Sequence, residues 1–233
     1  MTATDITIIL VRPQMGENIG AAARVMMNFG YSDLRIVAPR DGWPNPKAEA
    51  MAAGGLPVIE AAQVYEDVST ALADCQYAVA LTARSRELEL PAYTPREWSG
   101  LAEKPQRLAI VFGAERSGLE NEDIAQCNAI IHIPVAPEYP SLNLAQAVAV
   151  ICYELATAEP VAPSQAAEVA SKAELQGFFD QLEAGLNDRN FWKVAEKKPA
   201  MWRNIRAIFQ RNIYTSQEIR TLRGIIASLQ RPH

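Results

Sequence analysis

Several features on which other protein classes depend are scarce in this sequence. The 233 residues hold three cysteines and two histidines, and no apolar run approaches the roughly 20 residues that cross a bilayer. Cys75, Cys127 and Cys152 are odd in number and widely spaced, which argues against a disulfide framework and favours small buried side chains in a reducing compartment. With only His132 and His233 besides, the sequence also argues against a metal site.

The amino terminus lacks a secretion signal. Residues 1–5 have neither the positive charge nor the apolar stretch of a signal peptide. We therefore expect a cytoplasmic protein without a membrane partner. Its 49% hydrophobic content is enough to bury the core of one domain plus an appendage.

Positive charge is scarce overall but concentrated at one end of the chain. The formal net charge of −5 argues against a protein that binds nucleic acid through its overall field. Residues 189–233 nevertheless hold ten lysines and arginines against two glutamates. Arg203, Arg206 and Arg211 lie there among aromatic residues and are our candidate contacts to RNA phosphates. The alternative is a solvated helix face above an aromatic core.

Apolar runs alternate with helical patterns over the first two thirds of the chain. Strand-like runs occur at residues 6–11, 34–37, 77–81, 108–112 and 129–133. Helical patterns occur at residues 19–29, 47–53, 68–74, 122–127 and 145–158. This alternation is typical of an α/β domain with a mostly parallel sheet.

The composition changes after residue 157. Residues 158–170 contain two prolines and no apolar helix face, which predicts a linker. Apolar residues then recur at helical spacing over residues 175–186 and 219–229. We therefore expect a first domain at residues 1–157, a linker at 158–170 and a small RNA-contacting helical module at 171–233.

The glycine fingerprint Gly-x-Gly-x-x-Gly does not follow the first strand-like run, which argues against a dinucleotide-binding oxidoreductase. Three strand-loop-helix segments contain small polar residues instead. Their motifs are Asn18-x-Gly20-x-x-x-Arg24, Phe112-Gly113-x-Glu115-x-x-Gly118-Leu119, and Ile133-Pro134 followed by Ser141-Leu142-Asn143-Leu144. Prolines at 134, 137 and 140 stiffen the third loop and remove three amide donors.

In order and spacing, these motifs resemble those of the SpoU/TrmH RNA 2′-O-ribose methyltransferases, which belong to the SPOUT class. Three further segments are similar to the TrmJ type within this family: Thr82-Ala-Arg-Ser-Arg86, Pro137-Glu-Tyr139 and Leu222-Arg-Gly-Ile-Ile-Ala-Ser228. The resemblance implies a SPOUT-type α/β fold with a deep C-terminal trefoil knot. It also implies metal-independent methylation of RNA from S-adenosylmethionine, with tRNA anticodon-loop nucleotide thirty-two as the expected target. Ribosomal RNA as substrate, and a catalytically idle RNA-binding protein on the same fold, are the alternatives.

The resemblance places S-adenosylmethionine in loops at the C-terminal part of the domain. The contacts carried over by motif are Leu81, Thr82, Ala83, Gly113, Ile133, Pro140, Ser141 and Leu142. The three larger apolar residues among them would form a slot for adenine. Glycine at position 113 would allow a close backbone approach to the ligand.

The resemblance assigns catalysis to Arg24, Asn18, Glu115, Ser141 and Asn143. Arg24 is the leading candidate for acting on the ribose 2′-hydroxyl. A guanidinium is a poor general base because its pKa exceeds about 12. We therefore expect Arg24 to bind the RNA phosphate and orient the hydroxyl; direct deprotonation by Arg24 is the alternative. Glu115 is expected to hold Arg24 or Asn18, or to accept a hydrogen bond from the substrate; a plain surface carboxylate is the alternative.

Local chemistry adds expectations for the remaining polar residues. Asn18, and Ser141 with Asn143, are natural caps for the helices that follow them. His132 lies in an apolar run and is expected to be packed. Residues 145–155 are apolar nearly all round, as a helix buried on two sides would be, which accords with the homodimer and shared site that the resemblance implies.

Overall fold

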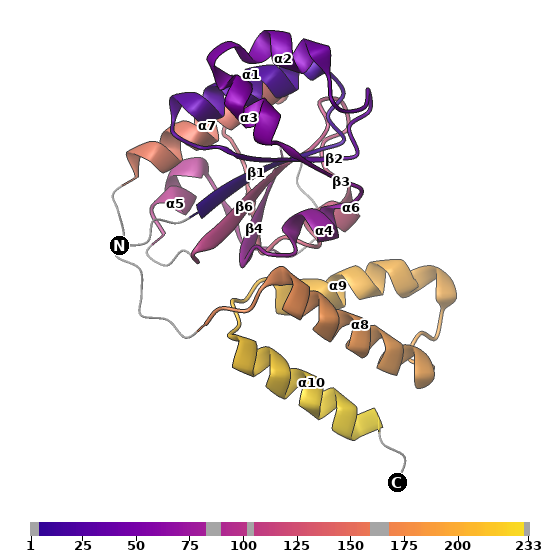
Figure 1. The fold of residues 1–233 in the computed structure, drawn as a ribbon. Helices are drawn as coiled ribbons and strands as arrows, with labels where there is room; N and C mark the ends of the chain where they lie inside the picture. The colour runs from indigo at the N-terminus through magenta and orange to yellow at the C-terminus, as the bar shows by residue number, and fades with distance from the viewer. Residues whose placement is uncertain (1–4, 83–89, 102–104, 159–167, 231–233) are drawn as a thin grey trace.

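The computed structural model describes residues 5–82, 90–101, 105–158 and 168–230. A sheet with helices on both faces forms the upper part of the molecule in Figure 1, and three further helices lie below it. The strands are β1 (Asp5–Val11), β2 (Asp33–Val37), β3 (Gln63–Tyr65), β4 (Tyr77–Leu81), β5 (Ala92–Tyr93), β6 (Arg107–Phe112) and β7 (Ala129–Ile131).

The sheet has the strand order β3-β2-β1-β6-β4-β7-β5, and all pairings described between these strands are parallel. The central strands are continuous runs of buried apolar residues, because helices cover both faces of a parallel sheet. The α/β class with a mostly parallel sheet is therefore confirmed. The trefoil knot stays a prediction.

The helices of the first part are α1 (Gly16–Asn28), α2 (Pro46–Ala52), α3 (Leu56–Ala61), α4 (Val68–Leu72), α5 (Pro95–Ser99), α6 (Asn121–Ile124) and α7 (Leu144–Thr157), with a 3-10 turn η1 (Ala53–Gly55). The C-terminal helices are α8 (Lys172–Asp188), α9 (Lys198–Gln210) and α10 (Ser216–Gln230), with a second turn η2 (Ala195–Lys197). The predicted helical region at the C-terminal end is thus present. Among the described residues, no helix is long and apolar enough to span a membrane.

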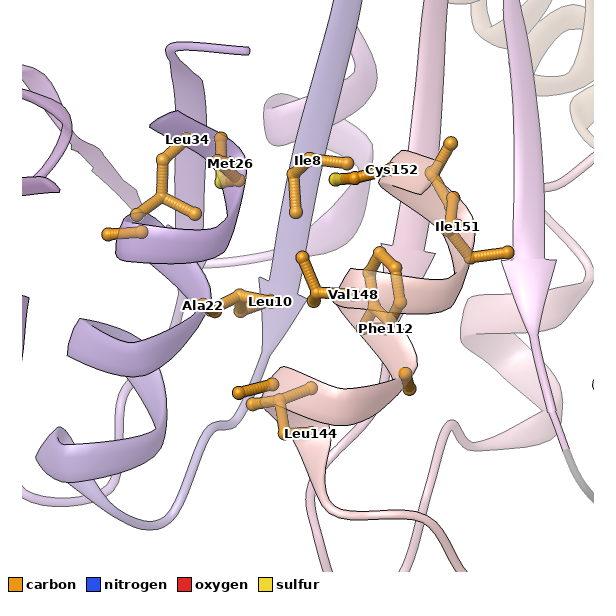
Figure 2. Packing of buried hydrophobic residues seen from close by; sticks show 14 of the residues in the cluster. Ile8, Leu10, Ala22, Met26, Leu34, Phe112, Leu144, Val148, Ile151 and Cys152 are labelled. Carbon is orange, nitrogen blue, oxygen red and sulfur yellow. The ribbon is translucent and has the colours of Figure 1, made fainter. Parts of the chain in front are cut away.

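One face of the sheet packs against α1 and α7, which lie side by side (Figure 2). Ile8 and Leu10 of β1 meet Met26 of α1 and Val148 of α7, and all four are buried completely. Burying one such side chain contributes about 1.5–3 kcal/mol. This core fixes α1 and α7, which both start at the edge where the strands end.

A small face on α1 allows α2 to pack closely. A Cβ atom on Gly20 would lie 2.2 Å from the carbonyl oxygen of Ala48 in α2. That contact leaves no room for any other residue at position 20. The expectation of close helix packing at this position is confirmed.

The opposite face is covered by α4 and α6, and Ala207 of α9 is buried against it. Cys75 and Cys127 belong to this core, and Cys152 belongs to the core between the sheet and α7. All three cysteines are buried and free, as expected.

The C-terminal helices form an aromatic core of their own and attach to the sheet domain through polar contacts as well as through Ala207. Phe178 and Phe179 of α8 are buried against Phe209 of α9. The backbone N–H of Lys172 donates to the carbonyl of Cys75 at 2.8 Å, and the Lys172 Nζ donates to Asn128 Oδ1 at 2.5 Å. The start of α8 is therefore anchored beneath the sheet.

Candidate active site

Three loops meet where parallel strands end. Residues 12–15 follow β1, residues 113–120 follow β6, and residues 132–143 follow β7. The carboxyl ends of parallel strands share one edge of the sheet, which is where ligands of such folds bind. The three motifs found in the sequence therefore lie at one edge.

A hydrogen-bonded network joins one residue from each motif. Asn18 Nδ2 donates to Glu115 Oε1 at 2.7 Å, and Asn143 Nδ2 donates to Asn18 Oδ1 at 2.9 Å. The other Glu115 oxygen accepts the backbone N–H of Gln14 at 2.8 Å. Glu115 thus holds Asn18, one of the partners expected for it.

The chemistry of the partners fixes the orientation of both amides. An ionised carboxylate only accepts, so Asn18 presents its NH₂ group to Glu115 and its oxygen to Asn143. Asn143 Oδ1 accepts the backbone N–H of Ala145 at 2.9 Å, which leaves its NH₂ group for Asn18. The network therefore has one hydrogen-bonding pattern.

Asn143 is the N-cap of α7, as predicted, and its capping box includes Gln146. The expected cap at Asn18 is wrong. Helix α1 begins at Gly16 with Met15 as N-cap, so Asn18 already lies in the first turn and its side chain turns to Glu115. Ser141 is exposed, stands two residues before the N-cap and does not cap α7.

A cavity of about 270 Å³ lies beside this network. This volume is close to the lower end of the range of about 300–1,000 Å³ that is usual for ligand pockets. Its lining includes Leu81, Thr82, Gly113, Ile133, Pro140, Ser141 and Leu142, which are seven of the eight expected donor contacts. The eighth, Ala83, lies outside the described residues.

The cavity wall extends beyond the expected donor contacts, although Glu115 was already expected at the site and Phe112, Gly118 and Leu144 belong to the motifs. The additional lining residues are Phe112, Ala114, Glu115, Arg116, Ser117, Gly118, Val135, Leu144 and Ala147. Several directly follow or precede expected contacts, so the continuity of the loops was the available signal. Ala147 lies one turn into α7, and nothing in the sequence distinguishes it from its neighbours.

Gly113 is required by the loop itself. A Cβ atom on Gly113 would lie 2.2 Å from the carbonyl carbon of Gly118 and 2.3 Å from the backbone nitrogen of Leu119. Gly118 has φ of +70°, a conformation that favours glycine. The two glycines therefore close the loop that holds Glu115, a role beyond the expected approach to a ligand.

Arg24 lies apart from the network. It is exposed, it does not line the cavity, and within the described parts of the chain its side chain forms no hydrogen bond or ion pair. Six residues separate it from Asn18, which at 3.6 residues per turn directs the two side chains to different faces of α1. The structure thus brings together Asn18, Glu115 and Asn143 but not Arg24.

His132 and Arg12 differ from expectation. His132 follows the end of β7 and is exposed, with its Nδ1 3.3 Å from the Thr82 carbonyl, so the prediction of a packed histidine is wrong. Arg12, which was not singled out, adopts φ of +50° directly after β1 and forms an ion pair with Asp123. That pair ties the first loop to α6.

The three candidate RNA contacts in α9 and just after it have different surroundings. Arg203 pairs with Glu122 at 2.8 Å, and the Arg206 guanidinium lies 4.2 Å from the centre of the Phe179 ring. Burial lowers the pKa of Arg206 to about 10. Arg211 is exposed and, among the residues with defined positions, has no side-chain hydrogen bond or ion pair. Their role stays a prediction, and Arg211 is the most accessible.

Titratable clusters elsewhere do not suggest a metal centre. Within the described ranges, no group of three or more His, Cys, Asp or Glu side chains could hold a metal ion.

Comparison with known proteins gives two family matches. Residues 5–153 match the SpoU rRNA Methylase family, and residues 173–233 match the C-terminal domain of the tRNA methyltransferase TrmJ. The tRNA (cytidine/uridine-2′-O-)-methyltransferase TrmJ of Photorhabdus laumondii is 35% identical, with 97% of each chain covered. The protein of the same name from Salmonella typhimurium is 38% identical, with 97% of this chain and 96% of the relative covered.

A solved structure is similar over almost the whole length. The crystal structure of TrmJ from Z. mobilis ZM4 superposes with a TM-score of 0.90 at 41% identity and covers 97% of this chain and 99% of its own. The family matches include both the sheet domain and the C-terminal helices. The chain therefore belongs to the SpoU methylase family of RNA methyltransferases and, within that family, to the TrmJ type.

Proposed function

We propose that the chain transfers a methyl group from S-adenosylmethionine to the ribose 2′-hydroxyl of tRNA, at anticodon-loop nucleotide thirty-two. The observation that carries the proposal is the position of the Asn18–Glu115–Asn143 network beside the cavity. The names of the TrmJ relatives give cytidine or uridine as the target, and we propose that this chain likewise accepts either nucleoside.

The cavity fits the proposed donor. Leu81, Ile133 and Leu142 supply apolar walls for a nucleoside, while Thr82 and Ser141 supply hydroxyl groups. The bound donor supplies an activated methyl group on a sulfonium. The protein's task is then to align the acceptor oxygen and to assist the departure of one proton.

The network gives the alignment a rigid frame. Glu115 fixes Asn18, Asn18 fixes Asn143, and Asn143 is locked by the first turn of α7. Ser141 lines the cavity two residues before Asn143 and would contact the donor or the ribose. We assign these four residues to the positioning of the reacting groups.

Arg24 is proposed to act across a homodimer interface. Arg24 is exposed and does not line the cavity, which supports a site completed by a second subunit. Helix α7 also exposes 52% of Tyr153, an apolar group that a partner would cover. Arg24 would bind the RNA phosphate and orient the 2′-hydroxyl, with the proton passing to that phosphate or to solvent.

Mixed dimers test this arrangement. A dimer of Arg24→Ala with Gly113→Trp should regain one working site, since one subunit keeps Arg24 and the other keeps its donor cavity. Heterodimers without recovered activity would place Arg24 and the donor in the same subunit.

We propose that residues 1–157 perform the chemistry and that residues 171–233, after a linker at 158–170, contact RNA. Exposed Arg211 is the favoured phosphate contact of this helical module, with Arg203 and Arg206 as further candidates. Phosphate contacts bind all RNA alike, so the target would be selected by the shape of the tRNA.

Methyl transfer to defined RNAs tests the function. Wild-type protein should methylate a tRNA transcript, and the same transcript with a 2′-deoxyribose at nucleotide thirty-two should accept no methyl group. An RNA fragment of the ribosome serves as the competing substrate. Transfer to the ribosomal fragment alone would favour the alternative substrate, and transfer to neither would leave a protein that only binds RNA.

A further inference from the structure

Tyr139 is the most exposed large hydrophobic side chain among the described residues, with 79% of its surface accessible. Other aromatic side chains of the sheet domain are more deeply packed; for example, Phe112 is 1% exposed and Trp98 is 2% exposed. An aromatic ring so placed has a large flat face that makes little contact with its own chain.

The backbone that carries this ring is restricted. The N–H of Tyr139 donates to the carbonyl of Ala136 at 3.1 Å, which closes a turn with Pro137 in its second position. Pro140 follows directly and restricts the backbone of Tyr139 as well. Little additional conformational freedom would be lost when a flat ligand stacks on the ring.

Tyr139 directly precedes residues of the cavity wall and lies close in sequence to the network. Pro140 and Ser141, the next two residues, line the cavity, and Asn143 joins Asn18. Asn143 is four positions after Tyr139, so their Cα atoms are at most about 14 Å apart even in a fully extended chain. A ribose held at the network would therefore have its base within reach of Tyr139.

Stacking suits the chemistry of a loop nucleotide. Bases in single-stranded RNA loops turn outward and stack on aromatic side chains. Every base has a π face, so a tyrosine platform would accept cytidine and uridine alike. Arg116, which is exposed on the opposite loop of the cavity, adds a cation for the neighbouring phosphate.

We propose that Tyr139 is a positioning residue that stacks on the base of the target nucleotide while its ribose lies at the Asn18–Asn143 pair. This inference rests on the proposed function, since it names how the substrate of that same site is held.

Variants at Tyr139 separate stacking from a structural role. Tyr139→Ala should lower kcat/KM for the tRNA transcript about 5- to 100-fold, the range that base–aromatic stacking supplies. Tyr139→Phe should keep nearly all activity, and Tyr139→Leu, which has apolar area but no π face, should resemble Tyr139→Ala. The affinity for S-adenosylmethionine, measured by calorimetry, should be the same in all four proteins.

A transcript whose target ribose lacks its base gives the decisive comparison. Wild type and Tyr139→Ala should methylate this abasic ribose at the same reduced rate, because without the base neither protein can form the stacking contact. If Tyr139→Ala reduces activity on the abasic and the complete transcript equally, or on neither, the inference is overturned while the proposed function stands. If wild type methylates no RNA, the proposed function fails and this inference fails with it.

Discussion

Replacing Asn18 by Asp changes a single contact in the network. The side chain keeps its shape and keeps an oxygen for Asn143, but the NH₂ group that donates to Glu115 becomes a carboxylate oxygen. Two carboxylates would then face each other at the position of a 2.7 Å hydrogen bond. We expect the variant to be less stable and to transfer methyl groups much more slowly.

The size of the effect follows from two contributions. A hydrogen bond to a charged group contributes about 1.5–3 kcal/mol. The like-charged pair raises the pKa of one carboxyl, and each unit of that rise is worth about 1.4 kcal/mol. Because Glu115 is only partly buried, water screens the pair, and we expect a total loss of about 2–4 kcal/mol at pH 8.

The loss should depend on pH with a defined sign. An acid whose pKa is raised by folding binds more protons in the native state than in the unfolded chain, so its stability falls as pH rises. The difference between wild type and Asn18→Asp should therefore be smaller at pH 5 than at pH 8, because protonation of one carboxyl relieves the repulsion. Urea unfolding at both pH values measures it.

Asn28→Asp is the matched control, since it makes the same change at the exposed end of α1. An acidic residue there opposes the helix dipole by at most about 1 kcal/mol. If Asn18→Asp is no less stable than this control at pH 8, and the difference from wild type is constant between pH 5 and 8, Asn18 does not donate to Glu115.

Three further predictions concern the loop, the module and its anchor. Gly113→Ala should lower the free energy of unfolding by about 1–3 kcal/mol and weaken donor binding in calorimetry, because the added Cβ would collide with Gly118. The control Gly54→Ala, which has open space around it, should leave stability and donor binding unchanged. Arg211→Glu should weaken tRNA binding and reduce the salt slope of log K by about one, and an unchanged slope in filter-binding assays would exclude a phosphate contact. Burial lowers the pKa of Lys172 from 10.5 to about 7, so between these pH values the folded state binds fewer protons than the unfolded chain. In thermal unfolding, the stability of wild type relative to Lys172→Met should therefore rise as pH increases through this window.

The central strands and long helices could be predicted because their burial leaves a clear pattern. Strands β1, β4 and β6 are apolar runs, and α7 and α8 show helical spacing over several turns. Edge strands β3 and β5 were missed because they have only three and two residues, respectively, and include exposed positions. They therefore form no apolar run. Helix α9 was missed because basic residues are interspersed among its apolar ones and only Ala207 and Gln210 are buried along it.

The site was predictable residue by residue but not in its connections. Motifs identified Asn18, Glu115 and Asn143, yet the bond between Asn18 and Asn143 joins residues 125 positions apart and depends on how the loops cross the sheet edge. The sequence likewise does not reveal that Gly113 faces Gly118, or that Arg206 packs on Phe179. These contacts arise from packing, which a one-dimensional pattern does not contain.

The central position of β1 has a consequence for synthesis of the chain. This strand is made first, but one of its two edges pairs with β6, which ends about 100 residues later. At about 5–20 residues per second, the ribosome leaves that apolar edge without its partner for about 5–20 s. The nascent chain would therefore need a chaperone or a temporary internal partner over this interval, and the candidate site can form only after its last loop has emerged.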